Sequence, residues 1–201
     1  MKCLVAVAHP DDEVIWMGGL ILRYPQWDWH ILSLCRADDP DRVPRFYQAA
    51  NRLNAKGCIS DLDDSPVPAP LSSDLSEIKS RIEFLVPRQY DLVFTHGVNG
   101  EYTRHPRHEQ VNKAVCEMID SGDLIGLTML FAYNDDNGSH IPRPLENAEI
   151  KIKLTPEEYA AKLHIVKDIY GFGENSFEYL ASSDIEAFYI YSEGKSITFD
   201  L

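Results

Sequence analysis

The residue types best suited to chemistry lie in one short segment, His9–Glu13, directly after the apolar stretch Val5–Ala8. The segment holds one imidazole and three consecutive carboxylates, and apolar residues follow it at once. Burying unpaired charges costs several kcal/mol or forces their neutralisation, so these groups need a partner. A metal cation is the simplest one. His9 and Asp12 are the mixed nitrogen and oxygen ligands that zinc accepts, and Asp11 remains free to act on a water held by the metal.

A second segment offers two histidines at the entrance to a predicted helix. His105 and His108 are three positions apart, so one helical turn can direct both towards one place. Pro106, between them, is typical of a helix start. His108 would complete a ligand set with His9 and Asp12 and leave coordination positions open for water and a substrate oxygen.

Three acidic or histidine-rich segments follow predicted strands: residues 9–13, 36–41 and 96–108. In open α/β sheets, ligands bind beyond the carboxyl ends of the strands. We therefore expect these three segments to meet in one site.

Short β-rich runs alternate with helical patterns, which predicts one α/β domain over residues 1–201 with a Rossmann-like, largely parallel sheet flanked by helices. The expected strands are Lys2–Ala8, His30–Leu34, Cys58–Ser60, Asp91–Thr95, Thr128–Tyr133, Ile185–Tyr191 and Ser196–Leu201. The expected helices are Val14–Tyr24, Pro44–Asn54, a helix from the N-cap Ser73 to Val86, His108–Ile119, and a helix from a Thr155 capping box to Tyr170. Residues 134–147 are expected to form a long loop.

Composition limits the classes of partner. The hydrophobic fraction of 44% and the charged fraction of 25% are ordinary for a globular protein. A formal charge of −13 argues against nucleic acid, whose phosphates are bound by clustered Lys and Arg, and against an anionic membrane surface. A homo-oligomer is left open.

The sequence also indicates a compartment. No run approaches the roughly 18 apolar residues of a transmembrane helix, so we expect no membrane insertion. The apolar start is too short for a signal peptide. The four cysteines are scattered without a Cys-x-x-Cys pair, which is typical of reduced thiols in a cytoplasmic protein.

Two motifs identify a family resemblance. The first is Ala-His-Pro-Asp-Asp-Glu at Ala8–Glu13, and the second is His-x-x-His at His105–His108 after Gly100-Glu101-Tyr102. In these the chain resembles the LmbE-like (PIG-L) family of zinc-dependent N-deacetylases, which remove acetyl groups from amino sugars and related conjugates. The similar layout extends from the first strand through the helix that contains Lys162 and Tyr170.

The resemblance implies a role for each motif residue. It implies a zinc site whose ligands are His9, Asp12 and His108. Asp11 would be the general base that deprotonates the attacking water. His105 would stabilise the tetrahedral oxyanion or protonate the departing amine, and Tyr102 would help to hold the oxyanion.

One departure from the family affects the acid side of the site. The family commonly has Asp between the two histidines, where this chain has Arg107. That Asp would support His105, and a guanidinium cannot accept a hydrogen bond. Either another carboxylate, Glu101 or Glu109, supports His105, or His105 works with a lower pKa.

Two further departures concern the substrate pocket. The spacing from Tyr102 to His105 is one residue longer than in the common family form. The family's Arg-x-x-Glu after the second strand appears here as Arg42-Val-Pro-Arg45, without the acid.

The function expected is zinc-dependent hydrolysis of an N-acetyl group from a small molecule that contains an amino sugar. Fe²⁺ or another divalent ion also suits this ligand set. Two alternatives stay open: an amidase acting on another acyl amide or thiol conjugate, and a non-catalytic metal- or sugar-binding module.

Simpler interpretations exist for several of these residues. An acidic helix N-terminus would explain the carboxylates of residues 11–13 but not His9. His96 is expected to pack in a loop, and Trp16 in the core or along the cleft. The acidic residues of 38–41 and of 63–64 are expected in solvated turns or on sugar hydroxyls.

Overall fold

The computed structural model describes residues 1–64, 71–102 and 105–192. Within these residues, a seven-stranded sheet has the order β3-β2-β1-β4-β5-β9-β8. β1 to β5 are parallel, whereas β9 is antiparallel to both of its neighbours. The strands are β1 (Lys2–Val7), β2 (Asp28–Cys35), β3 (Lys56–Leu62), β4 (Gln89–Thr95), β5 (Ile125–Phe131), β8 (Ile150–Lys153) and β9 (Ile185–Tyr191).

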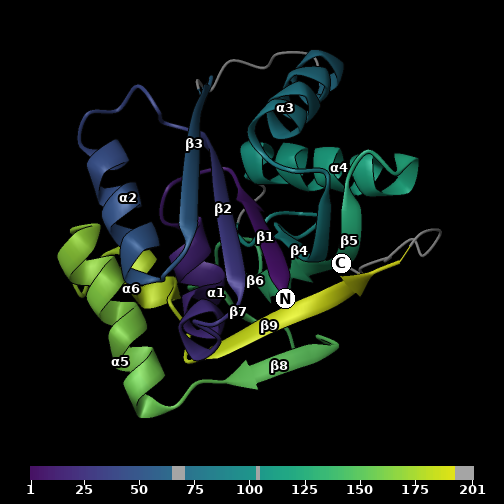
Figure 1. The fold of residues 1–201 in the computed structure, drawn as a ribbon. Coiled ribbons are helices and arrows are strands. Elements are labelled where there is room, and N and C mark those ends of the chain that lie inside the picture. The colour runs from purple at the N-terminus through teal and green to yellow at the C-terminus, as the bar shows by residue number, and fades with distance from the viewer. Residues whose placement is uncertain (65–70, 103–104, 193–201) are drawn as a thin grey trace.

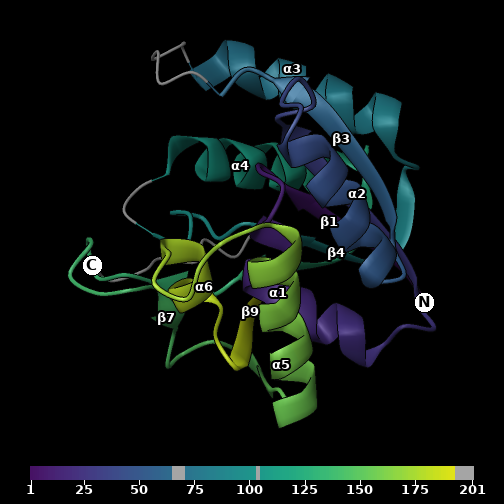
Figure 2. The same cartoon turned by 90° about the vertical axis from the view of Figure 1, so that its left-hand side faces the viewer.

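Helices cover both faces of this sheet, which confirms the predicted fold class (Figures 1 and 2). The two faces of β1 show why: Cys3, Val5 and Val7 pack into one hydrophobic cluster, and the residues between them pack into another. The first cluster includes residues of α1 (Asp12–Arg23), of α2 (Arg42–Arg52) and of the π-helical turn η1 (Ile165–Ile169), which continues α5 (Pro156–His164). The second includes α3 (Leu71–Leu85) and α4 (Pro106–Ser121).

The centre of the sheet is where the strand order reverses. The chain leaves β1 for β2 on one side, and β4 later returns to pair with β1 on the other. The carboxyl ends of β1 and β4 therefore lie side by side at this switch point, where open α/β sheets bind their ligands.

Helix α1 is broken near its middle, where Met17 has φ −151 and ψ 16. A break exposes the backbone donors of the next turn. Here the carboxylate of Glu186 accepts the amide hydrogens of Gly19 and Leu20 at 2.8 and 2.7 Å. Lys162 donates to the same carboxylate at 2.8 Å, and both charged side chains are fully buried. This pair joins α1 to β9 and α5.

Most predicted elements are confirmed, with boundaries that differ by a few residues. The capping box is present: Thr155 Oγ1 accepts from the Glu158 amide at 3.2 Å, and the Glu158 carboxylate accepts from the Thr155 amide at 2.8 Å. The N-cap prediction at Ser73 is wrong, because α3 already begins at Leu71.

Other predictions need correction at the carboxyl side of the chain. The strand expected to reach Tyr133 is interrupted at Ala132, and residues 134–147 contain a short ladder, β6 (Tyr133–Asn134) with β7 (Arg143–Pro144). β8 and α6 (Phe177–Ala181) were not predicted. The strand expected at 196–201 lies outside the described residues. Among the described helices, none is both long and apolar enough to cross a membrane.

Candidate active site

The turn after β1 carries most of the candidate residues. Its tight geometry depends on Asp11, which has φ 126, a region that side chains rarely adopt and that costs about 1–3 kcal/mol. The Glu13 carboxylate stabilises this turn, because it accepts the Asp11 amide hydrogen at 3.0 Å and the Tyr170 hydroxyl at 2.5 Å. Glu13 is fully buried, and its burial raises its pKa to about 7.

Three predicted ligands converge beside this turn. The distance from His9 Nδ1 to His108 Nε2 is 3.2 Å. Asp12 Oδ2 lies 3.4 Å from each of these nitrogens. The second oxygen of Asp12, Oδ1, accepts from Trp16 Nε1 at 3.0 Å, which fixes the carboxylate plane. These donor atoms form a nearly equilateral triangle.

Glu101 supports His108 through the ring nitrogen that is not part of the triangle. Its Oε2 lies 2.7 Å from His108 Nδ1 and 3.0 Å from His96 Nδ1, and its Oε1 accepts the Gly97 amide hydrogen at 2.8 Å. The two imidazoles stack with ring centroids 3.8 Å apart. With Nδ1–H donating to Glu101, the other ring nitrogen of His108, Nε2, faces Asp12 and is the one that can offer a lone pair to a cation once it is deprotonated. The suggestion that Glu101 supports His105 is therefore wrong, since it supports His108.

His96 is fully buried and closes this network rather than joining the triangle. Its Nε2 accepts the Ala8 amide hydrogen at 2.9 Å, so the lone pair is already engaged. The expected packing role is confirmed, with added hydrogen bonds that link the ends of β1 and β4.

The charges of the cluster shift the pKa values in opposite directions. Burial alone would lower the pKa of both histidines, but hydrogen bonds and charges from the carboxylates raise that of His9 to about 9 and that of His108 to about 10. Burial would raise the pKa of Asp12, but His108 and His96 hold it well below its usual range. Glu101 follows the same pattern, with a pKa lowered to about 2. The pocket thus strongly attracts positive charge.

Asp11 lies next to the triangle and is paired with a cation that sequence reasoning did not assign. Arg42 Nη1 donates to Asp11 Oδ2 at 2.7 Å. Burial and the charge of Asp12 raise the pKa of Asp11 well above its usual range, and Arg42 opposes this rise. A buried carboxylate with a raised pKa is a stronger proton acceptor than an exposed one.

His105 and Tyr102 lie on the other side of the cleft. His105 Nδ1 is buried without a hydrogen-bond partner among the described residues. Burial and the charges of His108 and His9 lower the pKa of His105 to about 4, as expected if no carboxylate supports it. The Tyr102 ring meets that of His105 edge-on at 5.4 Å and stacks on Trp16 at 6.2 Å, and burial raises the pKa of its hydroxyl.

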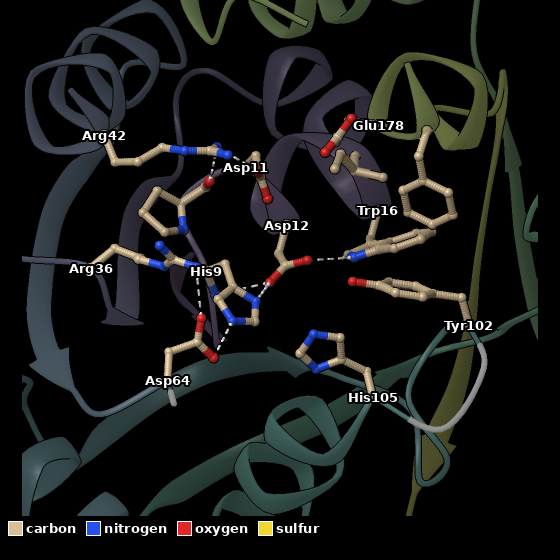
Figure 3. A pocket seen from close by; sticks show the side chains of 13 residues that line it. His9, Asp11, Asp12, Trp16, Arg36, Arg42, Asp64, Tyr102, His105 and Glu178 are labelled. Atoms are coloured by element: carbon tan, nitrogen blue, oxygen red, sulfur yellow. Dashed lines mark hydrogen bonds and ion pairs between the residues drawn. The ribbon is translucent and has the colours of Figure 1, made fainter. Parts of the chain in front are cut away.

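His9, Asp11, Asp12, Tyr102 and His105 line a cleft of about 180 Å³. Figure 3 shows His9 and Asp12 between Asp11 on one side and His105 on the other. Arg36, Arg42 and Asp64 form a charged wall on one side of the cleft, and Trp16 and Tyr102 lie on the opposite side with Glu178 near Trp16. Phe177 also lines the cleft.

All six residues predicted for the site therefore lie together, and the expected convergence of three strand ends is present. Arg36 is the residue of the second segment that lines the cleft. Arg42, Asp64 and Glu178 were not predicted as site residues. Arg42 stood out only as half of an incomplete motif, and the short helix α6 that carries Glu178 has no sequence signal of its own.

Comparison with known proteins adds a family match. The family model described as GlcNAc-PI de-N-acetylase (PIG-L) matches residues 4–119, more than half of the chain. A deacetylase of Corynebacterium diphtheriae, acting on 1D-myo-inositol 2-acetamido-2-deoxy-alpha-D-glucopyranoside, is 24% identical over 158 residues, which cover 61% of this chain and 54% of that protein. The chain spans about half the length of the curated relatives it matches.

Two solved structures have a similar fold. The N,N'-diacetylchitobiose deacetylase of Pyrococcus horikoshii superposes with a TM-score of 0.65 and 17% identity, covering 94% of this chain and 83% of that one. The 4-carboxy-2-hydroxymuconate hydratase of Pseudomonas putida superposes with a TM-score of 0.63 and 15% identity, covering 100% and 99%.

Proposed function

Because the chain belongs to the PIG-L family of GlcNAc-PI de-N-acetylases, we propose that it is a metal-dependent N-deacetylase. Its substrate is a small molecule that contains an N-acetylated amino sugar, and its products are acetate and the free amine. The name of the relative from C. diphtheriae and that of the chitobiose deacetylase support this substrate class.

The observation that carries the proposal is the triangle of His9 Nδ1, Asp12 Oδ2 and His108 Nε2. Ligands about 2.0–2.1 Å from a tetrahedral zinc ion lie roughly 3.3–3.4 Å apart. The sides of the triangle are 3.2, 3.4 and 3.4 Å, so the three atoms fit such an ion without rearrangement. A three-residue set that opens into a cleft is typical of a catalytic metal site, which leaves a position for water.

When bound there, a divalent cation would polarise the acetyl carbonyl and favour ionisation of water. Asp11 accepts the proton of the attacking water, because its carboxylate borders the cleft beside the triangle. Arg42 favours the ionised form of this carboxylate, against burial and the charge of Asp12, and fixes its direction through one oxygen. Asp11 then returns the proton to the departing amine nitrogen.

His105 acts from the opposite side of the cleft. Its buried Nδ1 without a described partner suits a hydrogen bond to the oxyanion of the tetrahedral intermediate. The Tyr102 hydroxyl lies on the same side of the cleft and can donate a second hydrogen bond to the oxyanion. It stays protonated at neutral pH because burial raises its pKa.

The test is a panel of N-acyl substrates given to the zinc-loaded protein, with acetate and free amine measured separately. We expect equal amounts of acetate and free amine from N-acetylglucosamine conjugates and lower turnover of longer acyl groups. Preference for another acyl amide or a thiol conjugate would favour the alternative function, an amidase. Stoichiometric zinc without turnover of any member would favour the non-catalytic module.

Hydration of a carboxylated alkene is a second candidate. It is favoured by Arg36 and Arg42 in the cleft wall, since guanidinium groups pair well with carboxylates. The hydratase of similar fold also matches the chain over nearly its whole length. Loss of ultraviolet absorbance from a conjugated dienoate, without amine release from any amide, would favour this candidate.

A further inference from the structure

Asp64 carries an interaction with the triangle that the proposed function does not use. It follows β3, in a segment expected to be a solvated turn or a sugar contact. Its Oδ1 lies 3.0 Å from His9 Nε2, and its side chain is only 20% exposed. Figure 3 shows the carboxylate directed at the imidazole of His9 from the side away from Asp12.

This contact selects one form of the His9 ring. A neutral imidazole that donates its Nε2–H to a carboxylate has its lone pair on Nδ1, which is the form that a metal ion binds. Nδ1 is the nitrogen that faces His108 Nε2 at 3.2 Å and Asp12 Oδ2 at 3.4 Å. Asp64 thus orients His9 just as Glu101 orients His108, although the two histidines use different nitrogens.

Asp64 is itself held from two directions. Arg36 Nη2 donates to Asp64 Oδ2 at 3.0 Å, so each carboxylate oxygen has one partner. The guanidinium of Arg107 donates to the carbonyl oxygen of the preceding residue, Asp63. Arg107, which replaces the acid common in the family, therefore ties α4 to the segment that carries Asp64.

We propose that Asp64 is a positioning residue of the metal centre, which holds His9 in the orientation and tautomer that ligate the ion. Arg36 binds Oδ2, the carboxylate oxygen that does not contact His9, and favours the ionised form of Asp64. The proposal rests on the proposed function to the extent that it needs a metal ion at His9 Nδ1. Carboxylates that accept from a ligand histidine raise its basicity, and their loss costs about 10–100-fold in metal affinity.

A simpler interpretation is a surface ion pair between Asp64 and Arg36, with His9 nearby. Such a pair contributes little and would leave zinc affinity unchanged. The chain offers a matched control in Asp61, which is on the same strand end, pairs with Arg81 at 2.6 Å and is 66% exposed.

The test measures the zinc dissociation constant of the full chain by competition with a chromophoric chelator. We expect Asp64→Ala to weaken zinc binding about 10–100-fold and Asp64→Asn to weaken it less, because the amide oxygen still accepts a hydrogen bond. Asp61→Asn should match the wild type. In ¹⁵N-labelled zinc-loaded protein, the His9 Nε2–H resonance should be protected from exchange and should lose that protection in Asp64→Ala.

The Arg36→Ala variant tests the same proposal while leaving Asp64 in place. It should weaken zinc binding at most about fivefold, and it should have no further effect in the Asp64→Ala background. Wild-type affinity in both Asp64 variants would overturn the proposal while leaving the proposed function intact. A wild-type protein that fails to bind zinc would overturn both.

Discussion

At the residue scale, each ionisable group of the turn after β1 has a different partner. His9 and Asp12 face each other and His108, Asp11 pairs with Arg42, and the Glu13 carboxylate accepts a backbone amide and a tyrosine hydroxyl. Chemically similar carboxylates therefore have distinct environments, and their pKa values move apart: Asp12 goes down and Asp11 goes up. Such separation is how neighbouring carboxylates take different tasks.

The role of His105 can be tested by substitution. His105→Ala should lower kcat about 10²–10³-fold, the usual effect of removing one donor to an oxyanion. His105→Asn should recover part of this loss, because its side-chain amide donates a hydrogen bond but does not titrate. If Asn is as poor as Ala while zinc content is unchanged, His105 transfers a proton instead.

Metal binding should be coupled to proton release. Hydrogen bonds and charges from the carboxylates raise the pKa of His9 to about 9 and that of His108 to about 10, which favours the protonated form of this pair at pH 7 in the metal-free protein. A metal ion must displace these protons, so zinc affinity should rise with pH from 6 towards 9. Calorimetry in buffers of different ionisation enthalpy should show net release of protons when zinc binds at pH 7. Affinity that does not change with pH would contradict this account.

At the scale of elements, the site depends on how α1 is anchored. The first half of α1 carries Asp12, and its second half begins at a break capped by Glu186, which pairs with the buried Lys162. Hydrophobic packing determines which face of α1 is buried. The Glu186–Lys162 ion pair holds the position of the break within the helix.

Removing one member of this pair should destabilise the fold. Lys162→Met leaves the Glu186 charge buried without its cation, which costs about 3–5 kcal/mol. The control is Lys153→Met, whose partner Asp184 is 42% exposed, with an expected effect of about 0–1 kcal/mol. Urea denaturation measures both, and similar losses would mean that the buried pair has no special role.

Helices and strands with a local sequence signal could be predicted, whereas those that depend on tertiary contacts could not. The apolar run of β1 and the capping box at Thr155 are local signals, and both are confirmed. β8 and α6 are short, with four and five residues, and depend on tertiary contacts: β8 pairs with β9, and α6 packs against the first hydrophobic cluster. The partners of the motif residues were beyond prediction for the same reason: Asp64 lies 55 residues from His9, and only the sheet order brings them together.

At the scale of the whole molecule, the topology explains the location of the site. Side chains from the ends of β1 and β4 form the triangle and its support, and residues after β2 and β3 form the charged wall. The family motifs predicted the first group, because their residue types and spacing carry the chemistry. The second group follows from the strand order and could not be read from the chain alone.

A single domain organised around this site predicts one cooperative unfolding transition. Zinc at 100 times its dissociation constant would add about 2.7 kcal/mol to the free energy of unfolding. In a chain of 201 residues, this corresponds to a rise in Tm of about 5–10 °C. Calorimetry with zinc and with a chelator tests both points. Two separate transitions, or a Tm unaffected by zinc, would argue against one metal-centred domain.

In the proposed reaction, His9, Asp12 and His108 hold the metal while Asp11 moves the proton. The most direct test is acetate release from an N-acetylated amino sugar by Asp11→Ala protein of measured zinc content. We expect one zinc ion per chain, as in the wild type, with turnover reduced to background. Loss of zinc from this variant would make Asp11 a ligand, and retained turnover with zinc bound would remove it from the reaction.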